Sequence, residues 1–479
     1  MKTYQLIHPS TNPRTAAHAR QVALSLLLAL TLGACTTPAP YQKPAMDVPV
    51  AFKESALWKT ARPDAATVPD DWWLLFKDSE LNALQVQVVL GNENLRASAL
   101  QVEVARAVLG SIRAGLGPTL GASTGITTSV APGITNAATS NSIAANASWE
   151  LDLWGRVSGA VSGAEARLQA SSADLASARL SMQAFLTQTY FSLRSTESQA
   201  ALLERSVTAF RRSLELTQNR YAGGVASAAD VAQATTQLRT TQAQLIESTS
   251  NRALLEHAIA TLLGKPAAAF SLASTATLPK APVAPLQLPA QLLERRPDIA
   301  AAERRVAAAN AQIGVAQSAY FPAITLSASA GLRGTGLLDL ISAPNLFWSL
   351  GPSLALALFD GGARKATEAS ARASTEQAAA SYRQTVLTAL QEVEDNLVVA
   401  ASLEEQIVLQ TDALTAAQRN LEITNNQYKA GTVSYLNVVT AQATALSAER
   451  ALLDVRHRRL VAIALLLKNL GGRWEGLVP

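Results

Sequence analysis

The chain has 479 residues, with 40 Lys and Arg, 36 Asp and Glu, and a single cysteine. This length exceeds what one compact core holds and predicts two or three structural regions. Aromatic residues make up only 5%, and alanine is abundant in the stretches of helical character, which suits close contact between helices. One cysteine excludes an internal disulfide, so packing must hold the fold together.

Residues 1–34 have the features of a secretion signal that is removed from the mature protein. Lys2, Arg14 and Arg20 are its only charged residues, and an apolar stretch follows at 22–32. Without these three, 37 basic residues stand against 36 acidic ones. The basic balance therefore comes largely from the leader, and nucleic acid is not an expected partner.

The leader ends in Leu32-Gly33-Ala34-Cys35, which resembles the lipobox of bacterial lipoproteins. The resemblance implies cleavage after Ala34 and a covalent lipid on Cys35, N-acyl and S-diacylglycerol, with no other cofactor. An ordinary signal peptide with an incidental cysteine is the alternative. No run of 18 apolar residues follows the leader, so a mature chain that crosses a membrane must do so with β-strands.

Two halves of the chain repeat each other. The pattern Leu-Glu-x-Thr-x-Asn-x-Tyr-x-x-Gly occurs at 214–224 and again at 421–431, an offset of 207 residues. Nearer the start of each half the offset is 204, and it pairs Gly110 with Gly314 and Pro118 with Pro322. A register that holds over long gapless stretches indicates a tandem duplication.

The halves have the same predicted elements in the same order. We expect a lipid-anchored equatorial segment at 35–79, a first repeat at 80–264, a Pro-rich equatorial linker at 265–290, a second repeat at 291–471 and a tail at 472–479. The first repeat is predicted to contain a helix at 80–116, strands at 118–130 and 142–153, a long helix at 155–221 and a helix at 228–263. The second is predicted to contain a helix at 298–319, strands at 322–332 and 348–359, a long helix at 362–428 and a helix at 435–470. Each long helix would measure about 100 Å, which requires helical partners along its length.

The four predicted strands alternate apolar with small or polar residues. Period-two alternation over about 11 residues is typical of membrane β-strands. Aromatic residues near the strand ends fit an interfacial girdle: Trp149, Trp154, Phe321, Trp348 and Phe359. A soluble antiparallel sheet with one wet face shows the same alternation, but the leader and the scarcity of charge favour a membrane. Four strands cannot close a barrel, so two, three or four copies must associate.

Several motifs together resemble the TolC-like outer-membrane efflux lipoproteins of the NodT type. They are Leu292 to Ile299 with the sequence LLERRPDI, Trp149 to Arg156 with WELDLWGR, Leu358 to Gly362 with LFDGG, and Cys35 followed by Tyr41 to Pro44. The family implies a mainly α protein with a membrane β-barrel: a homotrimer with a 12-stranded barrel in outer-membrane lipid, continued by a 12-helix periplasmic tunnel. It also implies a periplasmic adaptor protein and a proton-driven inner-membrane pump of the RND type or similar. Thr36 is not an Asp, which favours delivery to the outer membrane.

The two helix turns of the repeats should form the periplasmic end of the tunnel. Gly224 and Gly431 suit the left-handed position that ends a helix, and Ser227 and Ser434 are predicted N-caps with Asp230 and Asn437 three residues on. The resemblance implies that the tips contact the adaptor, through Gly223, Gly224, Ser227, Ala430, Gly431 and Ser434. It also implies a gate at Asp230, Leu436, Asn437 and Thr440. The family often has an acid where Thr440 stands, so Asp230 is either a cation-selecting gate residue, a helix cap, or both.

Catalysis finds no support in the sequence. The four histidines are scattered, there is no His and Cys cluster for a metal, and Gly264-Lys265-Pro266 lacks the glycine spacing of a phosphate loop. The expected function is passive conduction of small molecules such as drugs in a tripartite efflux system. Two alternatives are the channel of a type I protein-secretion system and a trimeric structural stalk.

Overall fold

The computed structural model describes residues 41–54, 71–130, 137–282, 295–336 and 340–470. Ala34 and Cys35, on which the predicted cleavage and lipid attachment depend, lie outside the described residues. Contacts divide the chain into two compact units, one with residues 108–165 and 307–376, the other with 44–107, 166–306 and 377–479. Each unit therefore combines corresponding stretches of both sequence repeats. The compact units do not coincide with the two repeats.

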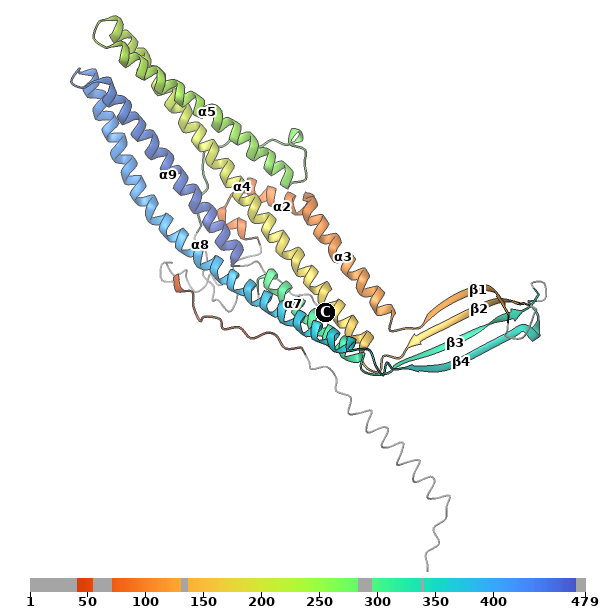
Figure 1. The fold of residues 1–479 in the computed structure, drawn as a ribbon. Coiled ribbons are helices and arrows are strands. Elements are labelled where there is room, and N and C mark those ends of the chain that lie inside the picture. Colours follow the sequence, from red (N-terminus) through yellow and green to blue (C-terminus); the bar gives the residue numbers. More distant parts are fainter. Residues whose placement is uncertain (1–40, 55–70, 131–136, 283–294, 337–339, 471–479) are drawn as a thin grey trace, which may run out of the picture. The chain divides into compact units, whose positions relative to one another are not determined.

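The first unit contains one antiparallel sheet in the order β1-β2-β3-β4 (Figure 1). Its strands are β1 (Thr119–Ser129), β2 (Ala138–Glu150), β3 (Ala323–Gly334) and β4 (Leu346–Ala355). A 3-10 turn, η4 (Ala343–Asn345), precedes β4. The central pairing of β2 with β3 joins the two repeats, with Trp149 opposite Leu326.

Two strands differ from their expected bounds of 142–153 and 348–359. β2 ends at Glu150 because the Asp152 carboxylate already caps the next helix, accepting from the backbone N–H of Val157 at 2.8 Å and of Ser158 at 2.7 Å. β4 ends at Ala355 ahead of Asp360, which accepts from Gly362 N at 3.0 Å in the same manner. Helix capping by an acid thus ends each strand earlier than the alternation does.

The helices expected after the strands lie close to their predicted bounds. They are α4 (Arg156–Ala222), α5 (Ala228–Leu262), α7 (Pro297–Ser318), α8 (Ala363–Lys429) and α9 (Tyr435–Asn469). Within the second unit, α4 and α5 form one antiparallel hairpin and α8 and α9 form another (Figure 1). No helix in the described part of the chain is both long enough and apolar enough to cross a lipid bilayer.

The single helix expected at 80–116 is broken at Asn92 into α2 (Ser79–Gly91) and α3 (Glu93–Ala114). The backbone of Gly91 meets the end of α5 so closely that an added Cβ would lie 2.4 Å from the Leu263 carbonyl oxygen. Asn92 then bridges the break, since its amide donates to Leu262 O at 2.7 Å and its oxygen accepts from Leu95 N at 3.0 Å. Asparagine is well suited to this double role at a helix start.

The core of the second unit includes residues from the segment at 35–79, the expected lipid-anchored equatorial segment. A 3-10 turn, η2 (Trp72–Phe76), places Trp72 fully inside, and Phe76 packs on Phe191 of α4 with ring centres 4.8 Å apart. The short turn η3 (Ala267–Ala269) follows α5. Burying large aromatic rings is the strongest apolar contribution available to so alanine-rich a chain.

Candidate channel surfaces and helix tips

The strand register sorts the sheet's side chains onto two chemically different faces. One face carries large apolar residues that nothing in the described protomer covers: Leu120 is 80% exposed, Trp348 76% and Leu354 65%. Contiguous apolar surface of this kind marks a contact with lipid or protein. The alternation along each strand matches that of strands whose apolar side faces lipid.

The opposite face is built almost entirely from small residues. Gly, Ala, Ser, Thr and Asn occupy it, and hydrogen bonds cross it from Asn146 Nδ2 to Ser123 Oγ at 2.8 Å and between the hydroxyls of Ser329 and Ser349 at 2.7 Å. Small hydroxyl and amide groups bind water and leave space beside the backbone. This face is therefore suited to line an aqueous passage.

The predicted girdle residues lie at or beyond the strand ends. The Trp149 indole donates to Leu116 O at 2.9 Å, and the Trp154 indole donates to Pro322 O at 2.7 Å while its ring stacks on Phe321 at 4.9 Å. Trp348 is the third residue of β4, and Phe359, 91% exposed, lies beyond its end. An apolar ring with a satisfied polar tip is the chemistry of a membrane interface, and the girdle role stays a prediction.

Each hairpin tip ends its long helix on a glycine in the left-handed region. Gly224 has φ +77° and Gly431 has φ +78°, as the turn requires. Ser227 and Asp230 form the predicted capping box: the Asp230 carboxylate accepts from Ser227 N at 2.8 Å, and Asp230 N donates to Ser227 Oγ at 3.2 Å. Ser434 occupies the predicted N-cap of α9 with Asn437 three residues on, but among the described residues its hydroxyl makes no capping hydrogen bond, so the second tip lacks the capping box of the first.

The predicted gate residues on α9 share one exposed side of the helix. Leu436, Asn437 and Thr440 face away from the hairpin core, while Tyr435 and Val438 are buried. The Thr440 hydroxyl donates to Leu436 O of its own helix at 2.9 Å, so it presents its methyl group outward. The exposed side chains of Leu436, Asn437 and Thr440 are therefore apolar or neutral. Their role as a gate stays a prediction.

Sequence reasoning missed the contacts that join the two tips. Arg220 of α4 donates to Tyr428 O at 3.0 Å, and its guanidinium carbon lies 4.6 Å from the centre of the Tyr428 ring. Tyr428 packs edge-on against Tyr435, whose hydroxyl lies 3.1 Å from Ser213 Oγ. Burial raises the pKa of Tyr435 and keeps the hydroxyl neutral. The contact is not repeated in the other half, since at offset 207 Arg220 corresponds to Gln427 and Tyr435 to Ala228.

A second group of charged residues holds the extended segment that follows α5 against the helices of the same unit. Arg194, buried on α4, pairs with Glu80 and Glu197 and donates to Ala273 O at 2.8 Å. Arg252 of α5 pairs with Glu197 and donates to Leu272 O at 2.7 Å. Opposite charges that are both buried and hydrogen-bonded to backbone hold an extended segment in one position.

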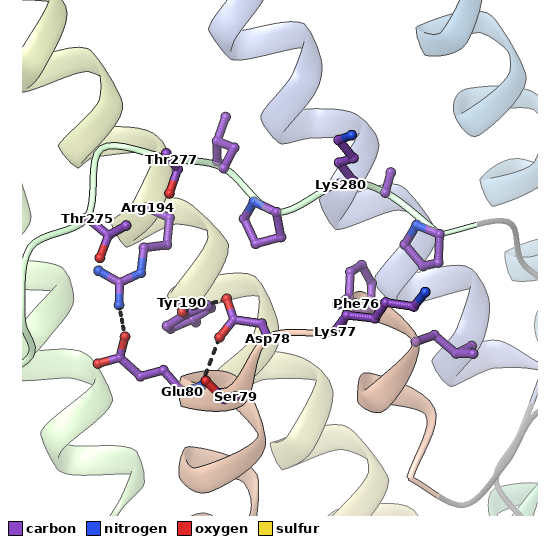
Figure 2. Close-up of a pocket in the computed structure, with 15 residues that line it drawn as sticks. Phe76, Lys77, Asp78, Ser79, Glu80, Tyr190, Arg194, Thr275, Thr277 and Lys280 are labelled. Atoms are coloured by element: carbon purple, nitrogen blue, oxygen red, sulfur yellow. Dashed lines mark hydrogen bonds and ion pairs between the residues drawn. The ribbon is translucent and has the colours of Figure 1, made fainter.

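A cavity of about 880 Å³ lies beside Arg194 and Glu80 (Figure 2). Several of its polar groups are paired with one another: the Tyr190 hydroxyl donates to Asp78 Oδ2 at 2.8 Å, and Asp78 Oδ1 caps α2 by accepting from Leu81 N at 3.0 Å. Burial and the hydrogen bond to Asp78 raise the pKa of Tyr190. Asp78, Glu80, Tyr190 and Arg194 are therefore satisfied within the chain, which supports a structural role for this part of the cavity.

The Glu-Arg-Arg-Pro-Asp motif fastens the start of α7 to α8. Arg296 is buried and pairs with Asp298 at 2.7 Å and Glu392 at 3.0 Å. Burial alone would raise the pKa of Asp298, but the hydrogen bond and charge of Arg296 outweigh it and lower the pKa.

Neither described histidine belongs to a metal site. Within the ranges the structure describes, no group of three His, Cys, Asp or Glu side chains could hold a metal ion. His457 Nε2 lies 3.2 Å from Ser192 Oγ, and burial lowers its pKa.

An exposed apolar sheet face, an opposite face of mostly small and neutral residues, and long helical hairpins that end in glycine turns together define a subunit of a membrane export channel. The chain belongs to the outer membrane efflux protein family, whose model matches residues 84–265 and 288–472. It is thus an outer-membrane channel component for efflux and not an enzyme, and family membership removes the structural-stalk alternative. The mainly helical fold with paired strands in a tandem repeat is confirmed.

Named relatives match along almost the whole chain. It is 31% identical to outer membrane protein OprJ of Pseudomonas aeruginosa, over 94% of this chain and 95% of that protein. It is 32% identical to the pyoverdine export outer membrane protein OpmQ of the same species, over 94% and 97%. The cation efflux system protein CusC of Escherichia coli is 28% identical, over 94% and 98%.

Solved structures agree with this grouping. The outer-membrane channel OprN has a TM-score of 0.85 at 29% identity and covers 92% of this chain and 100% of its own. The open state of the Neisseria gonorrhoeae MtrE outer membrane channel has a TM-score of 0.80 at 27% identity, covering 91% and 98%.

Proposed function

We propose that three copies of this chain close a 12-stranded barrel in the outer membrane and continue it as a 12-helix periplasmic tunnel. The single observation that carries the proposal is the sheet with one exposed apolar face and one small, polar face. Within the described chain, β1 and β4 each pair on one side only. Unpaired backbone groups are costly in lipid, so the edges must meet those of other copies. The number three comes from the family resemblance.

The cargo is proposed to be small molecules. The names of the relatives refer to pyoverdine export, cation efflux, and toluene and antibiotic efflux pumps. A face of Gly, Ser, Thr and Asn offers no built binding site and fits a passive conduit. An inner-membrane pump of the RND type, or a similar one, would deliver cargo through a periplasmic adaptor that contacts the tips at Gly223, Gly224, Ser227, Ala430, Gly431 and Ser434.

Lipid attachment at Cys35 is proposed as a second attachment to the outer membrane, in addition to the barrel. The Leu-Gly-Ala-Cys sequence supports it, and the covalent group would be N-acyl and S-diacylglycerol cysteine. Labelling cells with an alkyne palmitate analogue tests this: the wild-type chain should carry label and Cys35→Ser should not. Label on the variant, or none on the wild type, would overturn the anchor without touching the channel.

The assembly is tested by native mass spectrometry of the detergent-purified protein, followed by insertion into planar bilayers. We expect a trimer mass and ohmic or gated single-channel currents. A stable monomer that gives no currents would overturn the proposed channel. A deletion strain should also become more sensitive to dyes and antibiotics, and the wild-type gene should restore resistance.

A further inference from the structure

The sheet carries one cation on its small, polar face. Arg333 lies opposite Ser142 in the β2–β3 register, on the same face as Ser329 and Asn146. Between Thr119 and Trp149 the sequence has no charged residue at all. Within the described strands, Glu150 and Arg333 are the charged residues, and the register places them at opposite ends of this face, about 27 Å apart along β3.

The two charges differ in their partners. The Glu150 carboxylate accepts two hydrogen bonds from Arg156, both at 2.6 Å, and so is neutralised at the end of the sheet nearest the helices. No carboxylate in the described part of the chain pairs with Arg333. Its guanidinium carbon instead lies 4.9 Å from the centre of the Phe347 ring, a contact that orients the charge without cancelling it.

Gly331 makes this arrangement possible. It stands directly opposite Phe347 in the β3–β4 register, and a Cβ there would lie 2.2 Å from the Ile143 carbonyl oxygen. With no side chain at 331, Arg333 reaches diagonally across to the ring, as long side chains do between neighbouring strands.

We propose that Arg333, oriented by Phe347, is a selectivity-determining residue that favours small anions, carboxylates included, at the end of the channel far from the helices. The inference rests on the proposed trimeric channel, in which the small, polar face lines the lumen. Three copies then place three cations around one passage, each without a carboxylate partner among the described residues, and the other residues of the described strands are neutral or paired. Charges of one sign around a passage raise the local concentration of counter-ions.

Ion selectivity in planar bilayers tests the proposal, using the full-length trimer in a tenfold KCl gradient. At about 0.1 M salt the Debye length is about 10 Å, so we expect Arg333→Gln to lower the chloride-to-potassium permeability ratio about twofold or more. Arg333→Lys should keep the wild-type ratio. Arg333→Gln removes one positive charge per subunit, and this fixes the direction of the expected change.

A matched pair of cysteine variants shows which face is responsible. A cationic methanethiosulfonate reagent on Arg333→Cys should return the chloride-to-potassium permeability ratio to the wild-type value, and an anionic reagent should lower this ratio further. Leu332→Cys, on the opposite face, should not respond to either reagent. An unchanged reversal potential in Arg333→Gln, or an equal response from both cysteine variants, would overturn the proposal. Absence of any wild-type current would instead count against the trimeric channel itself.

Discussion

The Arg220 guanidinium bridges the two helix hairpins at their tips, lying 4.6 Å from the Tyr428 ring centre and 3.0 Å from the Tyr428 carbonyl oxygen. A cation over an aromatic ring that also donates to a helix-end carbonyl is a stronger link than either contact alone. The hairpins of the two repeats are therefore fastened to each other where the proposed tunnel is narrowest.

Replacing Arg220 should loosen the tips. Arg220→Gln removes the charge and the stacking, and we expect a higher open probability and larger mean conductance in planar bilayers, with overall melting temperature little changed. Lys429→Gln is the matched control, since it removes an exposed charge at the same tip. Equal effects from both variants would show that net charge, not the Tyr428 contact, sets the gate.

The two roles considered for Asp230 can be separated by chemistry. Asp230→Asn removes the charge but keeps an oxygen that can accept from Ser227 N, whereas Asp230→Ala removes both. Loss of the cap should cost about 1 kcal/mol, so amide exchange at the start of α5 should quicken in the Ala variant and much less in Asn. If Asp230 also selects cations, both variants should lower the potassium-to-chloride permeability ratio equally. An unchanged reversal potential in both would leave Asp230 as a cap alone.

Arg296 should matter for stability far more than an exposed arginine does. Arg296→Met removes the buried cation from two carboxylates that are themselves about one-third exposed, and the loss of its charge-assisted hydrogen bonds should cost about 1.5–3 kcal/mol. Arg305→Gln, which breaks the half-exposed pair with Asp174, should cost about 0–1 kcal/mol. Thermal unfolding in detergent measures both, and similar melting temperatures would contradict the burial argument.

The same motif predicts an acid limit to stability. The pKa of Asp298 is lowered in the folded state, so its contribution is complete above the unfolded pKa of about 3.9 and is lost as pH falls through the folded pKa. The melting temperature of the wild type should therefore drop below about pH 4. Asp298→Asn should melt lower at neutral pH and show a shallower drop, and parallel curves would disprove the assignment.

Gly331 should not accept even one methyl group. The Cβ of Gly331→Ala would press against the Ile143 carbonyl and Ala144 backbone, and overpacking of this kind costs about 1–3 kcal/mol. Gly351→Ala, in the neighbouring strand with open space around it, is the control. Heat stability of the assembled protein on semi-native gels should fall for Gly331→Ala only.

Local patterns were sufficient for most elements because periodicity and turn chemistry act over a few residues. The glycines at 224 and 431 and the Ser227–Asp230 cap could be predicted in this way. The break at Asn92 could not, because its cause is the backbone of residues 262–264, which lies about 170 positions along the chain. β2 and β4 end at Glu150 and Ala355, earlier than the alternation predicts. Their ends depend on which acid caps the helix that follows.

By itself, the sequence determined that this protein is a tandem duplication with four amphipathic strands, long helices and two glycine turns. The tertiary structure alone decided that Arg220 joins Tyr428 across 208 positions, that Arg296 is buried between two acids, and that Arg333 shares a face with Phe347. The physical reason is that alternation identifies a face, whereas partners across strands and helices depend on register and packing, which distant segments set together.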